Sequence, residues 1–125
     1  MRVNKTEDNQ TSHDDLEDRT DQFAKSVREF VKKIPKTLSN NEDGKHLMQS
    51  SGSVGATYTE ANESLSKKDI IFMIKVCRKG VNESRYWPRL IHPGDKLDVK
   101  RQRESLEQEA TELTNIFGAV FRKCE

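Results

Sequence analysis

The chain has 125 residues with a formal net charge of +1, and 34% of them are charged and 32% hydrophobic. This length fits one domain and is short for two, and the aromatic content of 6% favours amphipathic helices with narrow apolar seams over a sheet. The chain has no run of about 18 apolar residues and no basic N-terminal segment leading into an apolar one. We therefore expect a soluble, cytoplasmic protein without a membrane span, a secretory signal or a membrane partner.

Charge is distributed unevenly along the chain. Residues 1–22 carry three Lys/Arg against seven Asp/Glu, a net charge of −4, whereas residues 66–91 carry seven against two, a net charge of +5. The N-terminal segment is therefore acidic, and one segment in the second half of the chain is strongly basic. A basic segment of this kind favours contacts with phosphate groups.

The first helix is predicted over about 15–34. The preceding residues 1–13 hold almost no aliphatic side chains, so we expect a disordered acidic tail. Asp14 or Asp15 is the expected N-cap, and Pro35 ends the helix because the residue before a proline is disfavoured in helical geometry. The apolar stripe, with alternating spacings of four and three, consists of Leu16, Thr20, Phe23, Val27, Phe30 and Ile34.

The second helix is predicted over about 43–65, beginning near Glu42 or Asp43 after the polar linker KTLSNNEDG and ending with Leu65 directed inward. Its inward positions are rich in small residues. Glycine costs a helix interior about 1 kcal/mol relative to alanine, so two glycines here indicate close helix packing. We interpret the following residues as helix-packing or oligomer-interface positions: Gly52, Val54, Gly55, Tyr58 and Ala61, together with Trp87 of the next helix.

The third helix is predicted over about 67–91, with Ser66 as its N-cap and Asp69 in its first turn. Its apolar arc is broad, which indicates contacts on two sides or with another subunit. Pro88 lacks a backbone donor and is expected to kink or fray the last turn. The seam of this helix consists of Ile70, Ile74, Cys77, Val81, Ser84 and Ile91, with Met73, Val76, Trp87 and Leu90 beside it.

The fourth helix is predicted over about 96–123, after a turn of His-Pro-Gly-Asp in which Asp95 is available as its cap. Its apolar stripe is Leu106, Ala110, Leu113, Phe117 and Val120, widened by Ile116 and Phe121. Four helices with short connections and no strand candidate predict an all-α protein. We expect an antiparallel up-down-up-down four-helix bundle over residues 14–125.

Five cations of the third helix form the candidate nucleic-acid-binding site. They follow one another at spacings of 7, 3, 7 and 4 residues, which places them on one helix face, and we expect that face to lie opposite the apolar seam. Such a row could follow a phosphate backbone, and the alternative is an ordinary solvated polar face. The five residues are Lys68, Lys75, Arg78, Arg85 and Arg89.

No other residue pattern predicts catalysis or a metal site. Glu60, Glu63 and Glu83 have no histidine three residues further on, as a bundle metal site would require, so we expect no metal and no cofactor. Tyr58 and Trp87 could stack on bases, but their apolar surroundings favour packing.

The two cysteines and the histidines show no pattern typical of a reactive site. Cys77 and Cys124 have no CxxC spacing, and we interpret both as reduced thiols, with Cys77 a small core residue. Serine, cysteine and histidine show no nucleophile arrangement, so an enzyme is not expected.

Four segments carry a resemblance to a known family: DRTDQFA at 18–24, IPKT at 34–37, SGSVGATYTEANESLSKKD at 51–69 and RYW at 85–87. In this order and spacing they resemble the four helix bundle protein family, which includes the proteins encoded within intervening sequences of bacterial 23S ribosomal RNA genes. The chain also resembles, more distantly, the accessory protein of diversity-generating retroelements. The resemblance implies a four-helix bundle, a ring-shaped homopentamer and a role in nucleic-acid binding, and it implies no enzyme.

Three residues depart from the pattern of that family. Thr57 stands where an asparagine is usual, Gly80 where a glutamate is usual and Pro88 where a leucine is usual. Gly80 and Pro88 are both expected to weaken the third helix, and so to alter a surface built on it.

Two functions are therefore considered. The first is a non-enzymatic homo-oligomer, a pentamer by resemblance, that binds RNA or DNA through phosphate contacts. The second is a structural module that binds a partner protein, such as a reverse transcriptase or another subunit, through the apolar arc and the small-residue helix.

Overall fold

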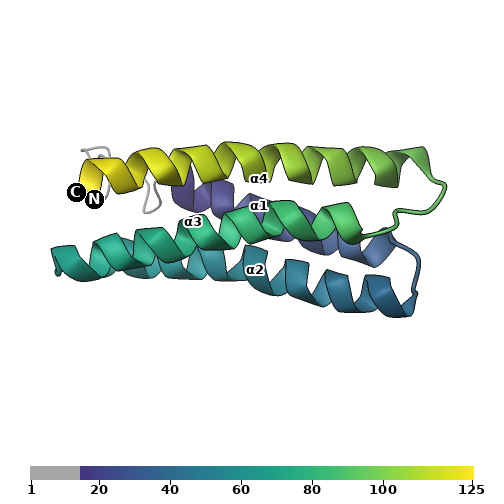
Figure 1. Ribbon diagram of the computed structural model, residues 1–125, viewed down its shortest axis with the longest axis horizontal. Coiled ribbons are helices and arrows are strands. Elements are labelled where there is room, and N and C mark those ends of the chain that lie inside the picture. The colour runs from purple at the N-terminus through teal and green to yellow at the C-terminus, as the bar shows by residue number, and fades with distance from the viewer. Residues whose placement is uncertain (1–14) are drawn as a thin grey trace.

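The computed structural model describes residues 15–125, so the tail predicted over 1–13 and the candidate cap Asp14 lie outside the described residues. Within them the chain forms four long helices and no strand, and the predicted all-α bundle is confirmed (Figure 1). The helices are α1 (Asp15–Lys33), α2 (Leu38–Glu63), α3 (Lys67–Leu90) and α4 (Leu97–Cys124).

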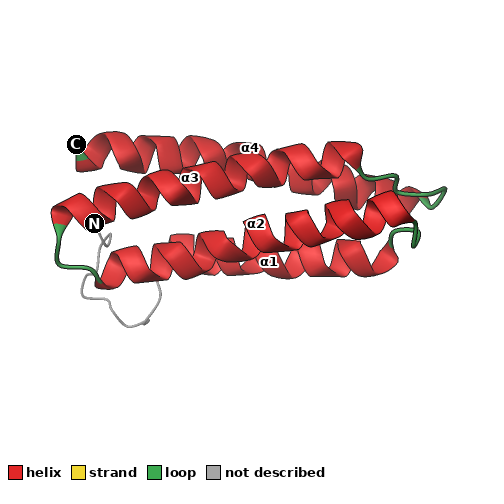
Figure 2. Ribbon diagram, turned by 60° about the horizontal axis from the view of Figure 1, so that its bottom comes forward, coloured by secondary structure: helices red, strands yellow, loops and turns green. Residues whose placement is uncertain are grey.

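The helices follow an up-down-up-down order. Each helix packs against the next one along the chain, and α4 returns to pack against α1, whereas α1 and α3 lie on one diagonal of the bundle and α2 and α4 on the other (Figure 2). The α1–α2 and α3–α4 connections lie together at one end, and the α2–α3 connection and the C-terminus lie at the opposite end (Figure 1). None of the helices within residues 15–125 is long and apolar enough to cross a lipid bilayer.

The core is made from one stripe of each helix, largely as the spacing predicts. One residue from each helix illustrates its stripe, and all four are almost completely buried: Phe30, Val54, Ile74 and Phe117. Tyr58 is also fully buried, and its ring meets Phe117 edge-on with centroids 5.6 Å apart. Leu65 was predicted inward, but it follows the end of α2 and is fully exposed.

Helix α2 begins at Leu38, earlier than the predicted start near Glu42 or Asp43. Thr37 is its N-cap, because the Thr37 hydroxyl accepts a hydrogen bond from the backbone N–H of Asn40 at 3.1 Å. The buried Asn40 side chain also joins the two connections at this end: it donates to the carbonyls of Pro35 and His92 and accepts from the His92 N–H. These bonds explain why a segment of linker-like composition is helical.

The ends of α3 and the start of α4 agree in part with the prediction. The hydroxyl of Ser66 accepts from the Asp69 N–H at 3.2 Å, which confirms the predicted N-cap of α3. Pro88 is buried inside the last turn, and the helix continues past it to Leu90. The prediction for Asp95 is wrong, because Lys96 is the N-cap residue of α4 and makes no side-chain capping bond.

Close contact between α2 and α3 depends on Gly80. A Cβ atom at this position would lie 2.8 Å from Val54 Cγ2 and 3.3 Å from the backbone oxygen of Ser50. One turn further on, the hydroxyls of Ser50 and Ser84 share a buried hydrogen bond of 2.9 Å across the same crossing. Gly80 was expected to weaken α3, and the structure adds a packing role that was not predicted, because its missing side chain is what allows the two backbones to approach.

Cys77 and Cys124 differ in burial. Cys77 is fully buried, its thiol faces the Val54 carbonyl at 3.6 Å, and burial raises its pKa to about 12, whereas Cys124 is only partly buried. Because the thiolate is the reactive form, we expect a chromogenic disulfide reagent at about pH 8 to modify Cys124 in the native protein and Cys77 only after unfolding. The Cys124→Ser variant should then be unreactive when folded. Equal rates for both thiols in the native wild-type protein would contradict this assignment.

Candidate functional site

The five predicted cations of α3, here called the α3 basic surface, lie along the boundary between α3 and α4. They are Lys68, Lys75, Arg78, Arg85 and Arg89, and all are exposed except Arg85, which is partly buried. The prediction that the whole face lies opposite the buried seam does not hold for Arg78 and Arg85. With 3.6 residues per turn, Arg85 and Arg78 directly border the seam, while Lys68 and Lys75 point further outward.

Contacts with α4 fix this placement. Three guanidinium atoms of Arg78 lie 3.3 to 3.4 Å from the position that a Cβ of Gly118 would occupy, so the guanidinium group lies flat against α4 where the glycine leaves room. One turn towards the start of α3, Lys75 Nζ lies 5.7 Å from the centre of the Phe121 ring, a cation–π arrangement. Gly118 therefore shapes the edge of the α3 basic surface, a role that its sequence position did not indicate.

Most of this charge has no carboxylate beside it. Arg89 pairs with Glu107 of α4 at 4.0 Å, and the neighbouring Lys79 pairs with Glu83 at 3.4 Å. Within residues 15–125, Lys68, Lys75, Arg78 and Arg85 form no ion pair. Four uncompensated cations are thus arranged along one edge of a rigid helix, where a polyanion could neutralise them.

Helix α4 adds polar groups to the same edge. Thr111, Asn115 and Arg122 are spaced from Gly118 by seven, three and four residues, which places them on the face of α4 that bears Gly118. Asn115 and Arg122 are exposed and Thr111 is partly buried. Their place beside α3 could not be predicted from the sequence, because it arises only from the pairing of two antiparallel helices.

The residues predicted for helix packing or an oligomer interface separate into two groups. Val54, Gly55, Tyr58 and Ala61 are buried among the chain's own helices and therefore belong to helix packing. Gly52 is partly buried, and a Cβ there would meet only the guanidinium end of Arg28 on α1.

Trp87, the last residue of that predicted set, lies partly buried in the groove between α2 and α3. Its ring stacks on His46 with centroids 4.4 Å apart and planes 12° apart. Tyr86 meets the same indole edge-on at 5.1 Å. Both Trp87 and Tyr58, considered above as base-stacking residues, thus have their rings engaged within the protein.

Two other aromatic side chains are accessible and were missed by the sequence analysis. Phe72 is 65% exposed and Tyr86 is 49% exposed, and both lie on the outer face of α3. Their spacing from cations was the available signal: Phe72 lies four residues after Lys68 and three before Lys75, and Tyr86 lies seven residues after Lys79.

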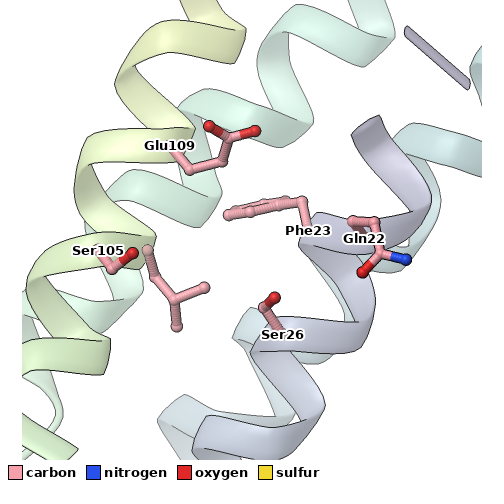
Figure 3. Close-up of a pocket in the computed structure, with 6 residues that line it drawn as sticks. Gln22, Phe23, Ser26, Ser105 and Glu109 are labelled. Carbon is pink, nitrogen blue, oxygen red and sulfur yellow. The ribbon is translucent and has the colours of Figure 1, made fainter. Parts of the chain in front are cut away.

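A cleft of about 220 Å³ lies between α1 and α4 (Figure 3). Its lining residues include two serines but no histidine, lysine or cysteine. Its carboxylate, Glu109, accepts two hydrogen bonds from Arg19, at 2.7 and 2.9 Å. These bonds raise the pKa of Arg19, so the pair acts as a fixed bridge between the two helices rather than as an acid or base. The residues that line the cleft are Gln22, Phe23, Ser26, Ser105, Leu106 and Glu109.

Acidic residues near this bridge and near the family-like segments do not converge on a metal site. Arg19 also pairs with Glu112 at 2.6 Å, and hydrogen bonds from Gln108 and Arg19 lower the pKa of the Glu112 carboxyl. In the described part of the chain, no group of three His, Cys, Asp or Glu side chains could hold a metal ion.

Comparison with known proteins identifies a similar fold. The structure is similar to the crystal structure of a protein with unknown function from the S23 ribosomal protein family of Bacteroides thetaiotaomicron VPI-5482, with a TM-score of 0.67. The two chains are 22% identical, and the match covers 85% of this chain and 97% of that chain. At this identity the likeness concerns the fold. No protein-family model matches the chain, and no curated protein matches it.

Proposed function

We propose that this four-helix bundle is a relative of the 23S rRNA-intervening sequence proteins and that it binds RNA or DNA without catalysing a reaction. Binding would use phosphate contacts made by the α3 basic surface, with little reading of base sequence. The observation that carries the proposal is the set of four cations without an ion-pair partner in residues 15–125, lined up along α3 beside α4.

The surroundings of these cations support the proposal. Arg78 is held flat against Gly118, so its guanidinium loses less freedom when it contacts a phosphate than a side chain in open solvent would. The polar Asn115 and Arg122 extend the surface onto α4. The fold shared with a protein of the S23 ribosomal protein family is consistent with a family associated with ribosomal RNA genes.

The test is charge reversal of three cations, Lys75→Glu, Arg78→Glu and Arg85→Glu together. Loss of three charged contacts at about 1 kcal/mol each should weaken binding of a labelled RNA or DNA oligonucleotide about a hundredfold at low salt. The loss should be similar for different base sequences, since phosphates carry no sequence information. Filter binding or fluorescence anisotropy measures the affinity.

A matched control changes the net charge by the same amount elsewhere. Lys25, Lys33 and Arg101 are exposed, belong to α1 and α4, and make no ion pair within residues 15–125. Their triple replacement by glutamate should lower affinity only slightly, through the general field. Equal losses in the two triple variants would show that net charge, not the α3 basic surface, governs binding, and would contradict the proposal.

A second candidate function is binding of a protein partner or of further copies of this chain. Exposed leucines favour it: Leu38, Leu90 and Leu97 are 85, 48 and 58% exposed near the end of the bundle where the α1–α2 and α3–α4 connections meet. A pentamer would repeat the α3 basic surface around a ring and raise its potential. Light scattering after nuclease treatment tests self-association, because it measures the mass in solution. A mass well above the 14.4 kDa of a single chain would support assembly of several copies, and a mass of 14.4 kDa would contradict it.

A further inference from the structure

We infer that the nucleic acid bound by this surface is single-stranded, and that Phe72 and Tyr86 stack on its unpaired bases. This inference rests on the proposed function and adds a substrate class to it. It comes from the outermost face of α3, where the two exposed aromatic rings alternate with cations. Neither Tyr58 nor Trp87, for which packing was favoured over base stacking, stacks on a base in this proposal.

The outermost face of α3 is a single continuous stripe. Its members succeed one another at steps of four and three residues and fall within an arc of about 80° around the helix axis. In order they are Lys68, Phe72, Lys75, Lys79, Asn82 and Tyr86. Lys68 precedes Phe72 by four residues and Lys75 follows it by three. Arg89 follows Tyr86 by three residues.

The exposure of the Phe72 and Tyr86 rings indicates a role other than packing in the core. Phe72 is 65% exposed and Tyr86 is 49% exposed, whereas the core aromatic residues Phe23, Phe30, Tyr58 and Phe117 are buried. Tyr86 is also pre-positioned, because its ring rests edge-on against Trp87, which is in turn stacked on His46. A ring held in this way loses little conformational freedom when a base covers its open face.

The combination of exposed aromatic rings and cations on one face favours binding of a single strand over a duplex. Base–aromatic stacking requires an unpaired base whose flat face is accessible, whereas a duplex hides these faces and presents mainly phosphates to a helix edge. The sequence separation of fourteen residues between Phe72 and Tyr86 corresponds to about 21 Å along the helix axis. A single strand that reaches both rings would pass between them Lys75, which makes no ion pair within residues 15–125, and then Lys79, which is paired with Glu83. Together with Lys68 and Arg89 at the two ends of the stripe, Lys75 favours a polyanion over an uncharged protein surface.

The experiment compares ring-removing with ring-keeping substitutions at the same two positions. Phe72→Leu and Tyr86→Leu keep apolar bulk but remove the aromatic face, and Phe72→Tyr and Tyr86→Phe keep the face. The probes are an oligothymidylate of about 16 nucleotides, the upper site size of a typical single-strand-binding unit, and a duplex of the same length. Each leucine variant should bind the single strand roughly tenfold more weakly, and each ring-keeping variant should bind it as the wild type does.

Three further results separate this inference from the proposed function. Duplex affinity and the salt dependence should stay unchanged in the leucine variants, since no phosphate contact is lost. If the leucine variants bind the single strand as the wild type does, or if all four variants lose affinity equally, stacking is refuted while phosphate binding by the α3 basic surface stands. A change in solution mass in the leucine variants without nucleic acid would assign the rings to contacts between copies of the chain and would also refute stacking.

Discussion

The Phe117→Ala variant is expected to lower the free energy of unfolding by about 3 to 5 kcal/mol, the range for removing a large aromatic side chain from a closed core. Phe117 is completely buried, and its ring packs edge-on against the equally buried Tyr58, at 5.6 Å between centroids and 77° between planes. Truncation removes the apolar contacts of Phe117 and leaves a cavity in the buried core. Urea unfolding followed by circular dichroism measures the change.

The control for this prediction removes the same atoms from a different place. Phe72→Ala also converts phenylalanine to alanine within a helix, but Phe72 is 65% exposed. Its unfolding free energy should stay within about 0.5 kcal/mol of the wild-type value. Similar losses in both variants would show that Phe72 is part of the packed core and would contradict its proposed role as an accessible stacking ring.

The Gly80→Leu variant is expected to lower the free energy of unfolding by about 3 kcal/mol, towards the upper end for overpacking a well-filled interior. The first added carbon already lies 2.8 Å from Val54 Cγ2 and 3.3 Å from the Ser50 carbonyl oxygen. Val54 is β-branched and has little freedom to turn away, and the Ser50 oxygen belongs to the backbone. The helices must therefore separate, which also strains the Ser50–Ser84 hydrogen bond. Thermal and urea unfolding both report the loss.

Gly52→Leu is the matched control, because it makes the same substitution in the neighbouring helix α2. A Cβ at Gly52 meets only the guanidinium end of Arg28, which is flexible and can move aside. The gain in helix propensity of up to about 1 kcal/mol should therefore leave this variant as stable as the wild type or more stable. A large loss at Gly52, or none at Gly80, would contradict the packing described for the α2–α3 crossing.

The four helices and their buried faces could be predicted from the sequence, because the spacing of the apolar residues indicates which face of each helix is buried. The stripes that contain Phe30, Ile74 and Phe117 are found in the core as expected. The start of α2 could not be predicted, since its first turn depends on Asn40 bonding to the distant His92, a contact between two connections far apart in sequence. The packing role of Gly80 could not be predicted for the same reason, because it depends on where α2 crosses α3.

The candidate site could be predicted only in part. The spacing of the cations correctly placed them on one face of α3, but their orientation relative to the seam depends on Gly118 and Phe121 of α4, which a single helix pattern does not contain. The exposed aromatic rings were missed because Phe72 and Tyr86 were assigned neither to the apolar arc of α3 nor to the row of cations. Only the folded structure shows that Phe72 is exposed whereas Ile74 is buried.

The salt dependence of binding tests the central claim most directly. If the α3 basic surface contacts five phosphates of a single strand, a plot of log affinity against log salt concentration should have a slope of about −3.5, at about −0.7 per contact. Reversal of Lys75, Arg78 and Arg85 should reduce the slope to about −1.4, with two contacts left, while the Lys25, Lys33 and Arg101 control keeps the wild-type slope. A flat wild-type plot, or one whose slope survives reversal of the three α3 cations, would contradict the account.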